Sequence, residues 1–270
     1  MKKKIKIFIL ISFGILLLLH VRVIYNAGKQ ILSPVPKREA EISAPTGATP
    51  TPQKDPEAER RLQEEETRRF IAQFGPCRNV PILIYHHVGD KNGGLWVKTE
   101  SFREHISYLT QKDYTTITLV DLMENLQNGK SLPAKPVVIT FDDGYRDFYE
   151  KVYPILKEFN FKATIFVVTQ LLGGSEYLTW DQLAEMQGSG LVTIGNHTLS
   201  HSALTALDEA KLKDEIVSAN DILKEKLGRD VNVFAYPYGS LNGEAEKVLK
   251  DGGFKAAVTT NKGVSCAKLP

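Results

Sequence analysis

The sequence predicts an α/β fold in which parallel strands, each followed by a helix, form a barrel of seven or eight units. From residue 80 onward, short apolar runs alternate with segments of helical periodicity. Such alternation is typical of parallel sheets, and seven predicted strands favour a barrel over an open sheet. Polar motifs also follow several of the strand ends, which is where barrels build their functional sites.

The predicted strands and helices follow one another in order. The first strand, 80–85, is a continuous apolar run suited to burial. The helix after it places Phe102, Ile106 and Leu109 on one face and begins with a capping box of Ser101 and Glu104. The later strands are predicted at 115–118, 137–141, 163–168, 191–195, 232–236 and 255–259, and the later helices at 119–127, 145–159, 179–187, 208–227 and 244–250.

Residues 1–25 are predicted to be a membrane anchor or a signal segment. Four lysines among the first six residues flank an apolar stretch that is close to the length needed to span a bilayer. The basic flank should stay in the cytoplasm, so the rest of the chain would lie outside. No small residues form a cleavage site around Tyr25 and Ala27, which favours an uncleaved transmembrane helix; secretion after cleavage remains the alternative.

Two further segments precede the predicted domain at 80–270. Residues 26–56 form a linker that contains six of the thirteen prolines and too few apolar groups to order itself. Residues 57–79 are dense in Glu and Arg and predict a solvated, charged helix.

Charge and cysteine content exclude some classes of protein. Residues 1–79 contain 14 Lys or Arg against 8 Asp or Glu, whereas residues 80–270 contain 20 against 24. The folded part is therefore mildly acidic, which argues against nucleic acid as a partner. Cys77 and Cys266 are too few for a disulfide scaffold, and both one bridge and two free thiols remain open.

Two adjacent carboxylates, Asp142 and Asp143, follow the strand at 137–141 and precede Gly144. Like charges this close repel, and the pair is easier to tolerate if one acid binds a cation while the other stays free to take a proton. A simple Asp-Gly turn with solvated acids is the alternative for such a motif in isolation.

Histidines and a proline turn follow other predicted strands. His197 and His201 stand four residues apart, and on one helical turn that spacing places both rings on the same side. Two His and one Asp make a common set of ligands for a divalent transition metal with open positions. Tyr236-Pro237-Tyr238-Gly239 fixes a turn that can aim a backbone N–H at the rim, and Tyr85-His86-His87 ends the first strand.

Taken in order, Thr140-Phe141-Asp142-Asp143-Gly144, His197-Thr198-Leu199-Ser200-His201 and Tyr236-Pro237-Tyr238-Gly239 resemble the polysaccharide deacetylase family, the NodB-homology domain of carbohydrate esterases. The opening Tyr85-His86-His87 resembles the subgroup of poly-β-1,6-N-acetylglucosamine deacetylases. The resemblance covers about residues 80–270. It implies a deformed (β/α)7–8 barrel and a metal-dependent hydrolase that removes acetyl groups from N-acetylated sugars.

The resemblance also implies roles for single residues. Asp143, His197 and His201 match the metal ligands, for Zn²⁺ or alternatively Co²⁺ or Ni²⁺, and Asp142 matches the catalytic base. The backbone N–H of Tyr238 would stabilise the oxyanion. The late Leu-x-His of the main family is absent, so the subgroup nominates His86 as the acid, with His87 in reserve. An arginine that usually steadies the base is replaced by Ala235.

The function expected from these matches is removal of N-acetyl groups from an N-acetylglucosamine polysaccharide at the cell surface. Poly-N-acetylglucosamine or peptidoglycan would be the partner, and the N-terminal helix would hold the enzyme on the membrane. A catalytically impaired relative that only binds glycan is the alternative, because Ala235 and the missing late motif depart from the family pattern. The chain stops at Pro270, just after the seventh predicted strand, so truncation is also open.

Overall fold

The computed structural model describes residues 20–22, eight helical residues between 57 and 72, residues 77–260 and residues 266–268. The central element is an eight-stranded sheet in the order β1-β11-β10-β9-β8-β7-β3, with β6 paired to β7. Every pairing in it is parallel except that of β1 with β11. The strands are β1 (His20–Arg22), β3 (Ile82–Tyr85), β6 (Thr115–Thr116), β7 (Pro136–Phe141), β8 (Ala163–Val167), β9 (Val192–Asn196), β10 (Val233–Ala235) and β11 (Ala256–Thr259).

The sheet curves into a half-barrel and does not close. Among the described strands, β3 ends one side of the sheet, and no pairing joins it to β11 or β1. The parallel α/β architecture predicted from the sequence is therefore confirmed, but a closed barrel is not formed. Helix α3 (Leu119–Asn128) contacts β11 and also β12 (Cys266–Lys268), which pairs with β2 (Cys77–Asn79) in a separate ribbon.

Alternating side chains along each strand build separate cores on the two faces of the sheet. On the concave face, Val138 of β7 and Phe166 of β8 pack with Val233 of β10 and with the apolar side of α3. On the convex face, Ile139 and Ile165 belong to a second core. Helices therefore cover both faces, and the strand ends between them form the rim.

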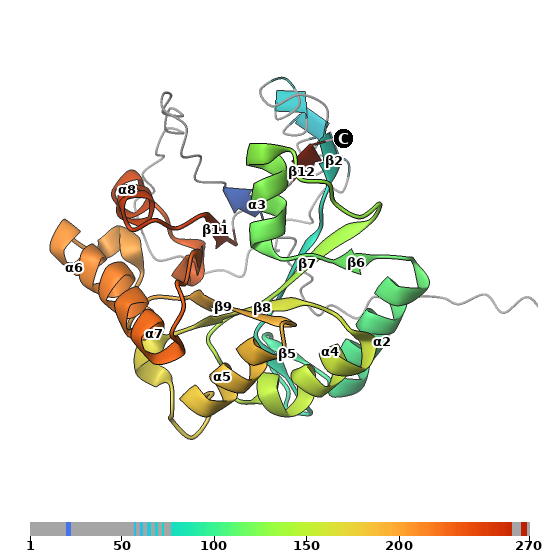
Figure 1. The fold of residues 1–270 in the computed structure, drawn as a ribbon, viewed down its shortest axis with the longest axis horizontal. Helices are drawn as coiled ribbons and strands as arrows, with labels where there is room; N and C mark the ends of the chain where they lie inside the picture. The colour runs from blue at the N-terminus through green and yellow to red at the C-terminus, as the bar shows by residue number, and fades with distance from the viewer. Residues whose placement is uncertain are drawn as a thin grey trace, which may run out of the picture.

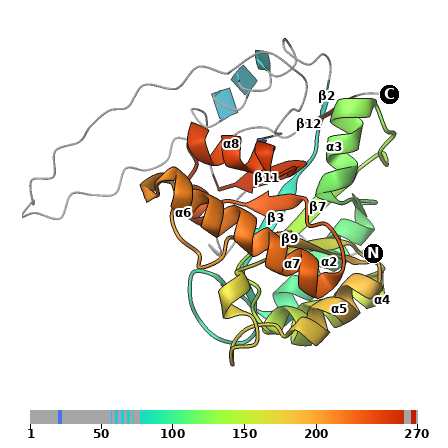
Figure 2. The same ribbon diagram turned by 60° about the vertical axis from the view of Figure 1, so that its left-hand side comes forward.

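The helices that cover the convex face lie together on one side of the sheet, whereas α3 lies on the other (Figure 1). A third core joins α6 and α8 to β10 and β11, and Figure 2 shows these two helices beside each other. The remaining helical segments are α2 (Thr99–Gln111), η1 (Phe148–Val152), α4 (Tyr153–Phe159), η2 (Thr169–Leu171), α5 (Trp180–Gly188), η3 (Leu204–Ala206), α6 (Glu209–Lys213), η4 (Asp214–Ser218), α7 (Ala219–Leu227), η5 (Pro237–Gly239) and α8 (Gly243–Asp251).

Helix starts agree with the sequence in some places and differ in others. Thr118 and Thr179 form capping boxes at α3 and α5, and Asp208 caps α6. The box predicted for Ser101 and Glu104 is wrong, because Phe102 N already donates to Lys98 O and the helix begins at Thr99. Ser101 thus lies inside the first turn.

The predicted membrane segment is only partly within the described residues. His20–Arg22 form strand β1 on the edge of the sheet rather than helix, with His20 opposite Thr259. The rest of 1–25 and the linker at 26–56 lie outside the described residues. No helix in the described part of the chain is long and apolar enough to cross a membrane.

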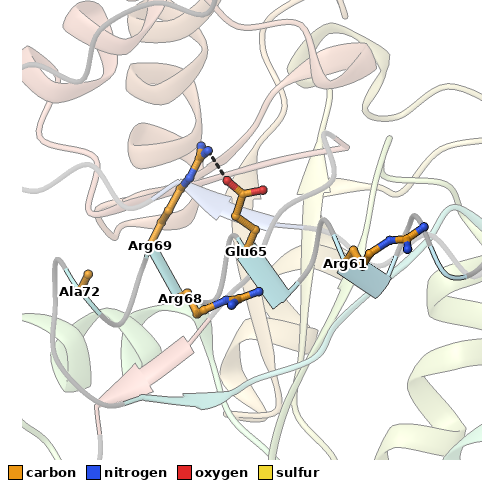
Figure 3. A pocket seen from close by; sticks show the side chains of 5 residues that line it. All are labelled: Arg61, Glu65, Arg68, Arg69 and Ala72. Atoms are coloured by element: carbon orange, nitrogen blue, oxygen red, sulfur yellow. Dashed lines mark hydrogen bonds and ion pairs between the residues drawn. The ribbon is translucent and has the colours of Figure 1, made fainter.

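The charged stretch predicted as a helix at 57–79 is helical wherever it is described between 57 and 72, and the side chains described there are exposed. The prediction is wrong at its end, because Cys77–Asn79 form strand β2, which pairs with β12. Arg61, Glu65, Arg68, Arg69 and Ala72 line a hollow of about 560 Å³, in which Arg69 pairs with Glu65 (Figure 3). Exposed ion pairs of this kind contribute little to stability. This hollow contains none of the motif residues at the strand ends.

Candidate functional site

Parallel strands bring the predicted site residues to one rim, because their carboxyl ends meet at the same edge. Asp142 and Asp143 directly follow β7, and His197 directly follows β9. His86 follows β3, and Tyr238 lies in η5 just after β10. The sequence separates these residues by up to 152 positions, and the sheet order brings them together.

Asp143, His197 and His201 form a compact cluster. Asp143 Oδ1 lies 3.4 Å from His197 Nε2 and 3.2 Å from His201 Nε2. The three ligand atoms all lie within 4.8 Å of one another. Asp143 and His197 are buried and His201 is half-buried, so little water competes for these atoms. The predicted ligand triad is therefore brought together.

Hydrogen bonds on the far side of each ring aim the histidines at this centre. His197 Nδ1 lies 2.8 Å from Ala235 O, and because a carbonyl only accepts, Nδ1 carries a proton and Nε2 is the nitrogen that faces Asp143. His201 Nδ1 lies 3.1 Å from the Tyr238 hydroxyl, which leaves its Nε2 facing Asp143. Outer partners of this kind hold histidine ligands in the orientation and tautomer that a metal needs.

The electrostatics of the cluster also suit a cation. Burial alone would raise the pKa of Asp143, but the hydrogen bonds from His197 and His201 outweigh it and hold this pKa far below its ordinary value. Burial has the largest single effect on His197 and lowers its pKa, but Asp143, the charge of Asp142 and the Ala235 carbonyl together outweigh it, so the net shift is upward. A buried carboxylate that stays ionised beside two imidazoles can bind a divalent cation, which would displace protons from the imidazole nitrogens that face it.

The loop at 197–202, called the histidine loop below, differs from the helical turn expected for the His197–His201 pair. Thr198 and His201 have φ values of 71° and 66°, so the chain is irregular and not helical. The two rings still converge, with centroids 4.9 Å apart. Asp143 and Tyr238 also have positive φ values, 73° and 58°. Such strain in residues other than glycine clusters at functional sites.

Asp142 is buried beside the cluster without belonging to it. Its side chain is 5% exposed, and Oδ1 has no hydrogen-bond partner among the described residues. Burial raises the pKa of Asp142; the positive charges of His197 and His86 oppose this, and the charge of Asp143 adds to it. Its backbone N–H donates to Tyr85 O, so the strand pairing fixes its main chain. An unpaired buried carboxylate oxygen of this kind calls for a partner, which a ligand can provide.

The structure separates the two histidines at the end of β3. His86 is close enough to the acid pair for its charge to lower the pKa of both Asp142 and Asp143, after the larger effects of burial and of the ligand histidines. His87 is instead held in place elsewhere: its Nδ1 lies 2.6 Å from Asp147 Oδ2. Its ring is sandwiched between Trp96 and Tyr145, at centroid distances of 4.0 and 3.5 Å. Of the two histidines, only His86 influences the charge of the acid pair, whereas His87 is held by Asp147 and two aromatic rings.

The turn after β10 places Tyr238 against the cluster. Its ring lies 4.6 Å from that of His201 and is 69% exposed. Only glycine fits next to it, because Gly239 has φ 67° and a Cβ there would meet Thr260 Oγ1 at 2.0 Å. The main chain of Tyr238 is thus fixed beside the histidine loop, where the sequence places an oxyanion donor.

Sequence reasoning missed two contacts of the cluster. Tyr145 lies close enough to Asp143 that the negative charge of this acid, after the larger effect of burial, raises the pKa of Tyr145. The hydroxyl of Tyr238 contacts His201, although only its backbone was expected to act. Tyr145 follows the acid motif by two residues, but no spacing rule indicates its role. The direction of a tyrosine side chain depends on the turn geometry.

A parallel half-barrel with an Asp-His-His cluster and a free carboxylate at its strand ends has the architecture of a metal-dependent hydrolase. The family profile for polysaccharide deacetylases matches residues 129–257, which include both acids and both cluster histidines. YxkH of Bacillus subtilis (strain 168), named as a polysaccharide deacetylase, is 32% identical over 203 residues, which are 75% of this chain and 72% of YxkH. The chain belongs to the polysaccharide deacetylase family.

Other relatives carry a more specific name. The poly-β-1,6-N-acetyl-D-glucosamine N-deacetylase of Escherichia coli (strain K12) is 28% identical, but the match covers 71% of this chain and only 35% of that protein. Among solved structures, the Streptococcus pyogenes deacetylase PplD, in complex with acetate, has a TM-score of 0.64 and 28% identity over 67% of this chain and 83% of that one. IcaB from Ammonifex degensii has a TM-score of 0.59 and 26% identity over 65% and 81%.

Proposed function

We propose that this protein removes N-acetyl groups from an N-acetylglucosamine polysaccharide of the poly-β-1,6 type, and that it does so outside the cell. The observation that carries the proposal is the Asp143-His197-His201 cluster with the buried, unpaired Asp142 beside it. The names of the relatives support the substrate class, and the similarity to an acetate-bound deacetylase supports the reaction. Peptidoglycan is the other acetylated glycan that the site would accept.

Asp143, His197 and His201 would hold one divalent ion, Zn²⁺ or alternatively Co²⁺ or Ni²⁺. When bound, such an ion polarises an amide carbonyl and lowers the pKa of a water molecule. Asp142 would take the proton from the attacking water through its unpaired Oδ1. The backbone N–H of Tyr238 would donate to the oxygen that becomes negative, a role worth about 3 kcal/mol at other oxyanion holes.

Cleavage of the amide C–N bond requires a proton for the leaving amine, which is otherwise too basic to depart. His86 would supply it, because its imidazole is close enough to the acid pair to influence both carboxylates. His87 is a poor alternative, since it is stacked between two aromatic rings and paired with Asp147.

Replacing His86 with glutamine is expected to lower kcat about 10²- to 10⁴-fold, the range for loss of a general acid, while metal content stays unchanged. The matched control is His87→Phe, which keeps an aromatic ring between Trp96 and Tyr145 and removes only the contact with Asp147. Acetate release and metal analysis on both variants would check this. Normal turnover in His86→Gln with collapse in His87→Phe would transfer the role to His87.

The acid limb of the pH–rate profile should report Asp142. A general base works only when deprotonated, so kcat/KM should fall as the pH drops through the pKa of Asp142. Burial raises this pKa in the metal-free protein, and a divalent ion held by the adjacent Asp143 would lower it, so the limb should be found at lower pH than burial alone would give. The measurement is kcat/KM against pH on a soluble N-acetylglucosamine oligomer. A metal-loaded enzyme whose profile has no acid limb would speak against Asp142 as the base.

A catalytically impaired glycan-binding protein is the second candidate. The residue at position 235 favours this candidate. Where the family usually has an arginine that orients the base, this chain has Ala235, which contributes only its backbone carbonyl to His197 and no side chain that could hold Asp142. The two candidates separate in one assay on a panel of β-1,6 and β-1,4 N-acetylglucosamine oligomers and peptidoglycan. Acetate release that a chelator abolishes supports the enzyme. Binding with unchanged acetyl content supports the impaired relative and overturns the enzyme.

Placement outside the cell rests on the basic and apolar character of residues 1–25. The protein should sediment with membranes and be accessible to added protease, whereas a variant lacking residues 1–19, which keeps strand β1, should remain in the cytoplasm. Cytoplasmic recovery of the full-length chain would refute this part of the proposal.

A further inference from the structure

The histidine loop is held between two helical segments: Thr169 and Gln170 of η2 donate to the carbonyls of Thr198 and Leu199, and η4 holds the other side. Leu199 N donates to Glu215 O at 2.9 Å, and Ser200 N donates to Glu215 Oε2 at 2.9 Å. Just before the loop, Asn196 Nδ2 donates to Ile216 O at 2.9 Å. Two consecutive residues of η4 thus hold the loop by main-chain and side-chain contacts at once.

Among the described groups, the carboxylate of Glu215 accepts the most hydrogen bonds from the histidine loop. The hydroxyls of Ser200 and Ser202 both donate to its Oε1, the latter at 3.1 Å, and they also contact each other at 2.8 Å. Burial alone would raise the pKa of Glu215, but the hydrogen bonds from Ser200 and its neighbours outweigh it and lower the net value. The side chain is therefore an ionised anchor, and hydrogen bonds to a charged acceptor are the stronger kind.

The local backbone explains why an anchor is needed. Thr198 and His201 both occupy the left-handed region, which is unfavourable for residues other than glycine. Such conformations persist only when the surroundings determine them. Two bonds are local, from Thr198 N to Asn196 Oδ1 and from His201 N to Thr198 Oγ1, and they shape the loop without fixing it to the rest of the molecule. The bonds from η2 hold the main chain at Thr198 and Leu199, and Glu215 is the group that fixes Ser200 and Ser202, which flank His201.

The helix itself is modified where it meets the loop. η4 is a π-helical segment inserted between α6 and α7. A π-bulge changes the hydrogen-bond register of a helix, and such bulges are frequent at functional sites. Here the carbonyls of Glu215 and Ile216 accept from the histidine loop and from Asn196.

We propose that Glu215 is a positioning residue of the metal site: its carboxylate holds the histidine loop so that His201 and His197 face Asp143 together. Glu215 would touch neither metal nor substrate and would act through Ser200 and Ser202. The inference rests on the metal site proposed above, but its test needs no substrate.

The test measures Zn²⁺ affinity of the purified protein by competition with a chromogenic chelator, together with the Tm of the metal-free form. Glu215→Ala is expected to weaken Zn²⁺ binding about 10- to 100-fold, the range for loss of an outer partner of metal ligands. Glu215→Gln should lose less, because the serine hydroxyls can turn and accept from the amide. The metal-free Tm should change little, since the freed donors lie near solvent.

Glu209→Ala is the matched control. Glu209 lies on α6 in the same helical run and is exposed, with its carboxylate paired to Lys213 at 2.9 Å on the helix surface. Unchanged Zn²⁺ affinity in both Glu215 variants would overturn the proposal. A loss of Zn²⁺ affinity accompanied by a large fall in the Tm of the metal-free protein would also overturn it, because Glu215 would then contribute to general stability. A wild-type protein that binds no Zn²⁺ would instead refute the metal site itself.

Discussion

Asp143→Asn is expected to abolish acetate release together with tight metal binding. Asn keeps the size of the side chain but removes the negative charge that two imidazoles now face at 3.2 and 3.4 Å. A neutral amide is a poor ligand for a divalent transition metal compared with a carboxylate. We expect Zn²⁺ affinity to fall by at least about 100-fold, more than for loss of an outer partner. Metal analysis after dialysis and an acetate assay would measure both effects.

The control for this variant is Asp251→Asn, an exposed acid at the end of α8. It makes the same chemical change away from the strand-end rim and should retain both metal and activity. If Asp143→Asn kept its ion and its activity while correctly folded, the cluster would not be the metal site.

Asp142→Asn should give the second large effect and the opposite pattern. Activity should fall about 10²- to 10⁴-fold, because no group remains to take the proton from water, while the metal stays bound. Asp142 interacts with the cluster electrostatically, and its Oδ1 has no hydrogen-bond partner among the described residues. Single-turnover acetate release and metal content on the same sample would separate the two acids.

Stability gives an independent check on Asp142. A carboxylate whose folded pKa is raised by burial costs stability at pH values above its unfolded pKa, and that cost is relieved as the pH falls through the folded pKa. At neutral pH, Asn at this position should therefore leave the Tm of the metal-free protein unchanged or raise it. A sharp drop in Tm would indicate a structural role and undermine the assignment as base.

Much of the fold was predictable because apolar runs in parallel strands are buried on both faces. The run Pro136–Phe141 is buried at every position, and strands β7 to β11 lie within a few residues of their predicted ranges. Strand pairings that depend on residues far away in the chain could not be predicted from the sequence. The apolar character of residues 1–25 predicts a helix that includes His20–Arg22, yet pairing with β11 makes these three residues a strand. The two-residue strands β4 (His87–Val88) and β5 (Trp96–Val97) are too short for any pattern to indicate.

The clustering of the three candidate metal ligands was predictable from the sequence, but the backbone conformation of the histidine loop was not. Asp143, His197 and His201 come together as expected, since parallel strands share one rim. The helical turn expected between the histidines was wrong, because Thr198 and His201 are left-handed and the loop between them is bonded to η2 and Glu215, which are distant in sequence. The family resemblance already nominated His86 over His87, and the structure adds contacts of His87 that no sequence pattern indicates. The stacking of His87 between Trp96 and Tyr145 involves residues 9 and 58 positions away.

The most direct test of the account is to remove metal from the purified protein with a chelator, add Zn²⁺ in steps, and follow acetate release from a β-1,6-linked N-acetylglucosamine oligomer. The account predicts that release stops on chelation and returns in proportion to bound metal, reaching its maximum at one ion per chain. Release that persists without metal, or a metal-loaded protein that releases no acetate, would contradict it.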